Sequence, residues 1–207
     1  MSAMNGGDVG IAIAEMIRVL SPHESADWTV PAGSLEWTCR ATAEHVAHDL
    51  LAYAGQLAGP AGDGYLPFDL TIGAEVTPLD VLRVVTACGQ LLRTAVDAAG
   101  PDVRAWHWGS CDPAGFAAMG VAEVLLHTYD ITRGLDVAWS PPDVLCRGVL
   151  DRLVPDAPAG EPVAVLLWST GRAELAGRPR RPSWVWKAAL SDPGVDSAAQ
   201  AGFSRGH

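Results

Sequence analysis

The sequence has little positive charge. Fourteen Lys and Arg residues stand against 24 Asp and Glu, a formal net charge of −10, and Lys187 is the only lysine. Such a chain repels the phosphates of nucleic acids and of anionic membranes, so we expect neither a nucleic-acid nor a membrane partner. The scarcity of lysine in a chain rich in Ala, Gly and Pro suggests a GC-rich coding sequence, which concerns origin and not chemistry.

Closely spaced cysteines, long apolar runs and the pattern of a signal peptide are also lacking in this sequence. The four cysteines, Cys39, Cys88, Cys111 and Cys146, form no CxxC, which argues against a zinc knuckle or a disulfide framework. No apolar run approaches the roughly 20 residues of a membrane span. No basic residue precedes the first apolar stretch, as it would in a signal peptide. We expect a cytoplasmic protein with free thiols, as a monomer or homodimer.

The apolar residues, which make up 49% of the chain, recur at helical spacing. Proline, glycine and capping residues bound the helical patterns, and they predict helices at about 7–20, from near Glu36 or Trp37 to Leu57, from Pro78 to just before Gly100, and at about 112–134. Four helices with two long connections describe a mainly α protein, a four-helix bundle.

The remainder of the chain is shorter and less regular. A further helix is predicted from Pro141-Pro142 through Leu153. Val163–Trp168 is apolar enough for a buried strand or a helical turn, and Ser183–Lys187 alternates like a strand. We therefore expect a bundle domain at 1–155 and a short α/β extension at 156–207, with a flexible tail from Ser191 onwards.

Three ionisable residues lie on the apolar face of the predicted fourth helix. Glu123, His127 and Asp130 are spaced by four and three residues, which places them along one line of a helix. Burying them unpaired would cost several kcal/mol, so they need a compensating partner. The spacing leaves two alternatives open: a helical salt pair or satisfied core histidine, and the ligands of a metal ion.

The predicted second helix offers a third metal ligand. His45 lies about 100° from the centre of its apolar stripe and His48 about 160°, so His45 can reach an interior site more easily. His48 is expected to form a solvated pair with Asp49. Two imidazoles and one carboxylate leave a coordination position open, as in a catalytic site, and they suit zinc, iron(II) or nickel(II).

Two segments carry a family resemblance. Trp37-Thr38-Cys39-Arg40-Ala41-Thr42-Ala43-Glu44-His45, and the segment from Asp112-Pro113-Ala114-Gly115-Phe116 through Glu123-x3-His127 to Asp130, resemble the DinB-like, mycothiol-dependent maleylpyruvate isomerase N-terminal domain family. The resemblance spans roughly residues 7–155. It implies an up-down-down-up bundle with a divalent metal, zinc first and nickel or iron as alternatives, held by His45, Glu123 and His127. Asp130 is expected to orient a ligand histidine.

The resemblance also implies a chemistry. Such enzymes are thought to bind the thiol of a small cofactor, mycothiol in actinobacteria, at the open metal position, where the thiol loses its proton and becomes a nucleophile. The expected function is a metal-dependent thiol transferase or isomerase acting on a small electrophilic metabolite. The alternatives are a metal-free or non-thiol DinB-like protein that binds, sequesters or cyclises a small metabolite, and a structural or dimerising bundle.

Residues outside the expected ligand set are candidates for the pocket. Trp37, His107 and Trp108 are expected to line it, with ordinary aromatic packing as the alternative. Arg172, in a cluster with Arg178, Arg180 and Arg181, is either a clamp for a substrate or cofactor carboxylate or part of a solvated loop. The C-terminal segment is short for the second domain of the isomerases proper, which argues against maleylpyruvate as the substrate.

Overall fold

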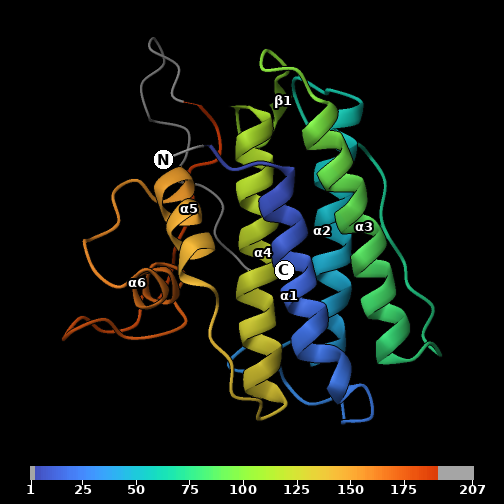
Figure 1. Cartoon of the computed structure of the whole chain (residues 1–207), viewed down its shortest axis with the longest axis vertical. Helices are drawn as coiled ribbons and strands as arrows, with labels where there is room; N and C mark the ends of the chain where they lie inside the picture. The colour runs from blue at the N-terminus through green and yellow to red at the C-terminus, as the bar shows by residue number, and fades with distance from the viewer. Residues whose placement is uncertain (1–2, 191–207) are drawn as a thin grey trace.

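Four long helices form a bundle in the computed structural model, which describes residues 3–190. They are α1 (Gly6–Leu20), α2 (Cys39–Ala58), α3 (Pro78–Ala98) and α4 (Pro113–Gly134). Helices α1 and α4 run in one direction, whereas α2 and α3 run in the other (Figure 1). The predicted mainly α, DinB-like bundle is confirmed, with its up-down-down-up order.

Capping residues fix where the bundle helices begin. Thr77 and Asp80 form a capping box at the start of α3, and Asp112 accepts a hydrogen bond from the Gly115 amide at the start of α4. Helix α2 begins at Cys39, later than the Glu36 or Trp37 predicted, because the Thr38 side chain caps it by accepting from the Ala41 amide. Trp37 is therefore in the loop before the helix.

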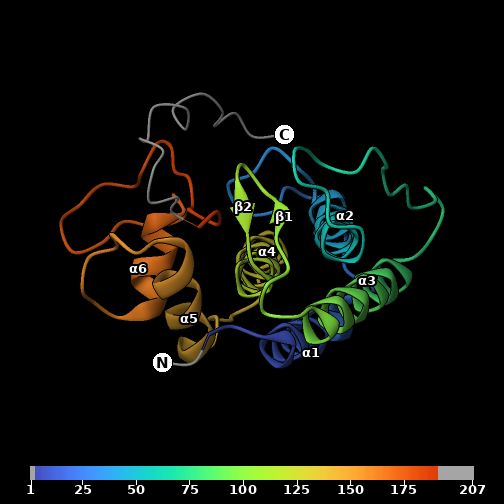
Figure 2. The ribbon, with the colours of Figure 1, turned by 90° about the horizontal axis from the view of Figure 1, so that it is seen from above.

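Helix α4 is the centre of the molecule and lies between α1, α2 and α5 (Figure 2). Seventeen of its residues are buried, and among its largest fully buried side chains are Phe116, Met119, Leu125, Leu126 and Ile131. The loop before α2 and the first residue of α2 pack closely on the end of α4, since a Cβ on Gly134 would lie 3.2 Å from Ala32 Cα and 2.6 Å from Cys39 Sγ. The start of α2 is thereby fixed against the end of α4, with the two helices antiparallel.

A small β-hairpin covers the start of α4. Strands β1 (Ala105–Trp106) and β2 (Ser110–Cys111) are antiparallel and are joined by residues 107–109 (Figure 2). The buried Gln56 of α2 holds this hairpin, because its amide nitrogen donates to the Trp106 carbonyl (2.8 Å). The hairpin thus lies in a fixed position beside α2 and α4.

The chain after the bundle contributes two short helices, α5 (Asp143–Leu153), which packs on α4, and α6 (Pro162–Ser169), which packs on α5 (Figure 1). The segment Val163–Trp168, predicted as a strand or a helical turn, is part of α6. The strand predicted at Ser183–Lys187 was wrong: this stretch has no strand partner among residues 3–190, and the Lys187 amide instead donates to the Leu153 carbonyl of α5. The predicted tail from Ser191 onwards lies outside the described residues, and the boundary at residue 155 stays a prediction.

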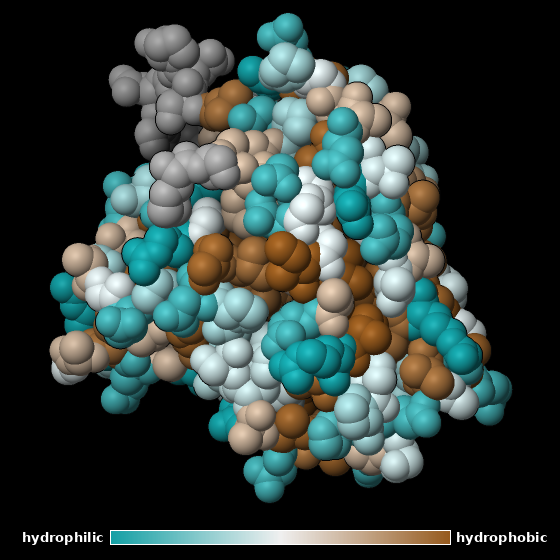
Figure 3. Space-filling view, viewed as in Figure 1, coloured by the Kyte–Doolittle hydropathy of each residue, from teal (hydrophilic) through white to brown (hydrophobic). Residues whose placement is uncertain are grey.

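The surface seen in Figure 3 mixes polar and apolar side chains, with an apolar group across the middle of this face, over α1 and α5. Ile11 of α1 and Val144 of α5 are exposed hydrophobic residues, 57% and 79% exposed. Within residues 3–190, no helix combines the length and the apolar character that crossing a bilayer requires.

Candidate metal centre and its pocket

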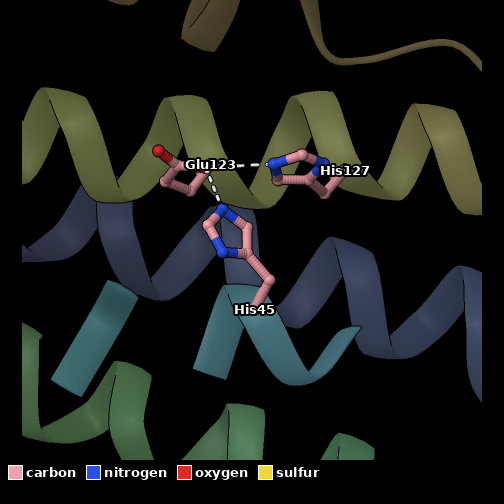
Figure 4. Close-up of side chains that lie close together, drawn as sticks. All are labelled: His45, Glu123 and His127. Atoms are coloured by element: carbon pink, nitrogen blue, oxygen red, sulfur yellow. Dashed lines mark ion pairs between the residues drawn. The ribbon is translucent and has the colours of Figure 1, made fainter. Parts of the chain in front are cut away.

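Three potential metal ligands converge between α2 and α4. One ligand atom from each of His45, Glu123 and His127 lies within 4.8 Å of the other two. Glu123 Oε2 is 3.2 Å from His127 Nε2 and 3.8 Å from His45 Nε2, so both imidazoles point toward one carboxylate (Figure 4). Glu123 and His127 share a face of α4 because they are one turn apart, and His45 faces them from α2.

A buried ion pair holds the far side of His127. Asp130 Oδ2 lies 3.1 Å from His127 Nδ1, and Arg172 donates to the same carboxylate at 2.6 Å from Nη2 and 3.0 Å from Nε. Asp130 is 3% exposed. When the neutral imidazole of His127 carries its hydrogen on Nδ1 and donates a hydrogen bond to Asp130, Nε2 has a lone pair that faces Glu123 and the cavity. This tautomer is the one a metal ligand requires.

A second carboxylate borders the site on the α2 side. Asp49, one turn after His45, places Oδ2 3.3 Å from His45 Nε2, and its Oδ1 is 3.1 Å from His48 Nδ1. His48 also reaches Asp69, with Nε2 3.2 Å from Oδ1. Acidic and basic side chains therefore alternate from Asp69 through the ligand set to Arg172.

The charges of these residues stabilise one another. Burial would raise the pKa of Glu123, but the hydrogen bond and charge of His127 and the charges of His45 and Arg172 outweigh burial and lower it to about 2. Burial would lower the pKa of His127, but the hydrogen bonds to Asp130 and Glu123 raise it to about 9. Burial and the charge of Glu123 raise the pKa of Asp49. The carboxylates around His45 and His127 thus stabilise a positive charge between α2 and α4, as the ligands of a cation do.

The donor set fits a divalent metal of the catalytic type. Bonds from zinc to His nitrogen and carboxylate oxygen measure about 2.0–2.2 Å, so the donors of one ion lie up to about 4 Å apart. The three ligand atoms are already within 4.8 Å of one another, and a small side-chain adjustment would bring them to a common ion. Two imidazoles and one carboxylate would leave a position open to a ligand from the cavity.

A cavity of about 1300 Å³ opens beside these three residues. Trp37, His107, Trp108 and Arg172, the pocket candidates from the sequence, all lie in its wall. The ring of Trp37 lies 4.8 Å from that of His45. His107 is buried, which lowers its pKa to about 4, and its Nδ1 is 2.7 Å from the hydroxyl of Tyr65. Arg172 forms an ion pair with the protein's own Asp130.

The four cysteines lie away from the solvent. All are buried, and burial raises the pKa of Cys39 to about 11 and that of Cys111 and Cys146 to about 12, and also raises that of Cys88. Cys39 Sγ contacts the carbonyls of Pro31 and Ile131. Cys39 is therefore a small buried residue, and the raised pKa values keep all four thiols protonated at neutral pH.

The sequence analysis missed several residues of this region. Tyr53 of α2 is buried, and its hydroxyl donates to Glu123 Oε1 at 3.3 Å. Asp49 had been grouped with His48 as solvated, although its spacing of one turn from His45 was a signal. Trp184 and Trp186 also line the cavity, and no sequence pattern had pointed to a pocket role for them.

One of three comparisons with known proteins finds a family match. Residues 9–132 match the model of the mycothiol maleylpyruvate isomerase N-terminal domain, a span that includes α2, α4 up to residue 132 and all three candidate ligands. No curated protein and no solved structure matches the chain closely enough to count as similar.

Proposed function

The chain belongs to the mycothiol maleylpyruvate isomerase N-terminal domain family, and we propose that it is a metal-dependent enzyme that activates a low-molecular-weight thiol. The activated thiol would be transferred to an electrophilic metabolite or would isomerise it. The observation that carries this proposal is the convergence of His45, Glu123 and His127 at the floor of a large cavity. Zinc is the first choice of metal, with nickel and iron as alternatives.

A divalent metal at this position would lower the pKa of a bound thiol, so that the nucleophilic thiolate exists at neutral pH. The residues of the chain have separate tasks. His45, Glu123 and His127 would hold the ion, and Asp130 keeps His127 in the tautomer that binds metal. Arg172 compensates the charge of Asp130, so that this carboxylate stays ionised although it is buried.

The thiol would come from outside the chain, because the four cysteines are buried and have raised pKa values. Mycothiol is the first candidate because of the family, and another small thiol is the alternative. A thiolate that adds to an activated double bond allows rotation about the former double bond, and elimination then gives the isomer. If the thiol stays attached, the outcome is S-transfer.

Elemental analysis of protein purified without chelator tests the metal. We expect about one equivalent of a transition metal in the wild type and its loss in His127→Ala. His48→Ala is the control: His48 belongs to the same series of alternating acidic and basic side chains but not to the ligand set, so this variant should retain the metal. A wild type with less than about half an equivalent, unchanged by His127→Ala, would sink the proposal. If metal is present, mycothiol at 100 times its dissociation constant should stabilise the protein by about 2.7 kcal/mol in a thermal shift assay.

A second candidate function is a metal-free protein that binds or sequesters a small metabolite. One observation favours it: Glu123, His127, Asp130 and Arg172 compensate one another's charges without any ion. Such a protein would give no metal in the elemental analysis, and its stability would not change when zinc or nickel is added.

A further inference from the structure

We propose that His107 is a ligand-binding residue of the large cavity: it donates a hydrogen bond from Nε2 to an oxygen atom of the bound molecule, and the Tyr65 hydroxyl positions this donor. The proposal rests on the proposed function for the reaction that the hydrogen bond serves, but the hydrogen bond itself requires neither a metal nor a thiol. It follows from the position of His107 between two cavities, from the partners of its two ring nitrogens and from its fixed surroundings.

His107 lies between two cavities. It lines the cavity of about 1300 Å³ beside the potential metal ligands, and it also lines a smaller one, of about 370 Å³, between α2 and residues 65–68. Tyr65, whose hydroxyl is 2.7 Å from His107 Nδ1, lines the smaller cavity but not the larger one. Nδ1 is therefore directed toward the smaller cavity, which leaves Nε2, on another side of the ring, for the larger one.

Nε2 of His107 is a polar atom without a protein partner. The side chain is 8% exposed, and among residues 3–190 only its Nδ1 forms a hydrogen bond. In the same part of the chain, the one fully enclosed side-chain atom that lacks a partner is Ser169 Oγ. Nε2 of His107 is therefore in contact with open space, and a buried polar group in this position is available to a ligand.

The Tyr65 hydroxyl determines which nitrogen carries the hydrogen. Burial lowers the pKa of His107 to about 4, so the imidazole is neutral at neutral pH and has one hydrogen on its two nitrogens. The distance of 2.7 Å is typical of an O–H donor. When the hydroxyl donates to Nδ1, the hydrogen of the imidazole is on Nε2. The large cavity then receives a neutral hydrogen-bond donor, which suits an oxygen acceptor.

The surroundings of His107 hold it in place. Its ring packs edge to face against the rings of Tyr53 and Phe116, with centroids 5.9 and 6.4 Å away. Its backbone amide donates to the Gly109 carbonyl across the turn of the hairpin. The next residue, Trp108, has a φ of 54°, in the left-handed region where a bulky side chain is strained. Strain of this kind concentrates at functional sites, where the surrounding structure maintains it.

A neutral donor at this place would serve the addition of a thiolate. As the sulfur–carbon bond forms, the π electron pair of the double bond moves toward the activating group. A hydrogen bond from Nε2 to an oxygen of that group stabilises the developing negative charge without transfer of a proton. Elimination of the thiolate returns the electron pair, so His107 ends the cycle with the hydrogen that it started with.

Nitrogen-15 NMR of the chelator-treated full chain tests the position of the hydrogen. We expect Nε2 of His107 to carry the hydrogen, and Nδ1 to carry none, between pH 6 and 8. His107→Gln identifies the signals of this residue among the six histidines. Tyr65→Phe should remove the preference for this tautomer, an effect that a purely structural role of Tyr65 would not produce.

Two probes of the same shape test binding. Five tryptophans line the large cavity, so aromatic probes suit it: Trp37, Trp106, Trp108, Trp184 and Trp186. Acetophenone has a carbonyl oxygen, and 2-phenylpropene has a methylene group in its place. Acetophenone should shift the Nε2 signal until it saturates, whereas 2-phenylpropene should leave that signal nearly unchanged. His107→Phe should weaken acetophenone binding about fivefold, and His107→Gln, which keeps an amide donor, should restore part of the affinity.

His48→Gln is the matched control. His48 lines only the smaller of these two cavities, and both of its ring nitrogens contact carboxylates, so this variant should bind acetophenone as the wild type does. A hydrogen on Nδ1 of His107, or equal shifts of Nε2 with the two probes, would overturn the proposal. A protein that purifies without metal but shows the expected Nε2 shift would contradict only the metal function, and a metal-containing protein without this shift would contradict only this inference.

Discussion

The cavity has two unlike sides. Its floor consists of His45, Glu123 and His127 with Asp130 behind them, whereas its wall consists of the five tryptophans and the arginines near the C-terminal end of the described chain. In the floor, the carboxylates of Glu123 and Asp130 are buried and paired with basic residues. In the wall, Trp108 is exposed and strained. The difference suggests that the floor performs the chemistry and the wall selects the molecule that enters.

The two sides also come from different parts of the chain. The residues of the floor lie on α2 and α4, and the bundle core fixes the orientation of these two helices. The potential metal-ligand atoms of the floor therefore have defined positions. Part of the wall comes from the hairpin and part from the segment after α6, which is held by a few backbone hydrogen bonds such as that from the Leu190 amide to the Ser110 carbonyl. Changes in the floor should therefore affect stability and metal binding, and changes in the wall should affect ligand choice.

The largest effect is expected from Asp130→Ala. This change leaves Arg172 buried without its carboxylate and removes the partner of His127, so the free energy of unfolding should fall by about 3–5 kcal/mol. Metal affinity should fall by about 10–100-fold. Denaturant unfolding and metal titration measure the two effects. Asp69→Ala is the control, since this exposed residue pairs with His48, and it should change stability little. If Asp130→Ala and Asp69→Ala lowered the free energy of unfolding and the metal affinity equally, the distinction between the buried floor of the cavity and the exposed surface would be contradicted.

Metal affinity should depend on pH through His127. The pKa of His127 is raised to about 9, and a metal binds only the neutral imidazole, so each ion bound below this pH releases a proton from this residue. Glu123, with a pKa of about 2, is ionised throughout. Affinity for nickel should therefore increase about tenfold per pH unit between pH 6 and 8, as measured by competition with a chelator of known affinity. An affinity independent of pH in this range would show that His127 does not bind the metal.

The smallest effect on stability is expected from Trp108→Asn in the wall. Asparagine tolerates the left-handed conformation, so relief of backbone strain should offset part of the lost contacts with Trp106 and Tyr65. The free energy of unfolding should change by less than about 1 kcal/mol. Trp28→Ala is the matched comparison, because Trp28 is 3% exposed and its removal should cost about 3–5 kcal/mol. If Trp108→Asn lowered the free energy of unfolding as much as Trp28→Ala does, Trp108 would be contributing to stability as a core residue does.

Helical periodicity explains which parts of the floor could be predicted. Glu123 and His127 lie one turn apart on α4, and the wheel position of His45 on α2 already favoured it over His48. The partner of Arg172 could not be predicted, because Asp130 is 42 residues away and no local pattern joins them. Trp184 and Trp186 had been assigned to a strand from their alternation. Alternation indicates which side chains share a face, but not whether another strand is available to pair with them.

A titration of the cobalt(II)-loaded protein with mycothiol tests the central claim most directly. Cobalt(II) replaces zinc in sites of this type, and a thiolate bound to it gives a charge-transfer absorption band in the near ultraviolet. The account predicts that this band appears and saturates with thiol, that one proton is released for each thiol bound, and that His127→Ala abolishes the band. A protein that binds cobalt but gives no band with mycothiol or with any other small thiol would contradict it.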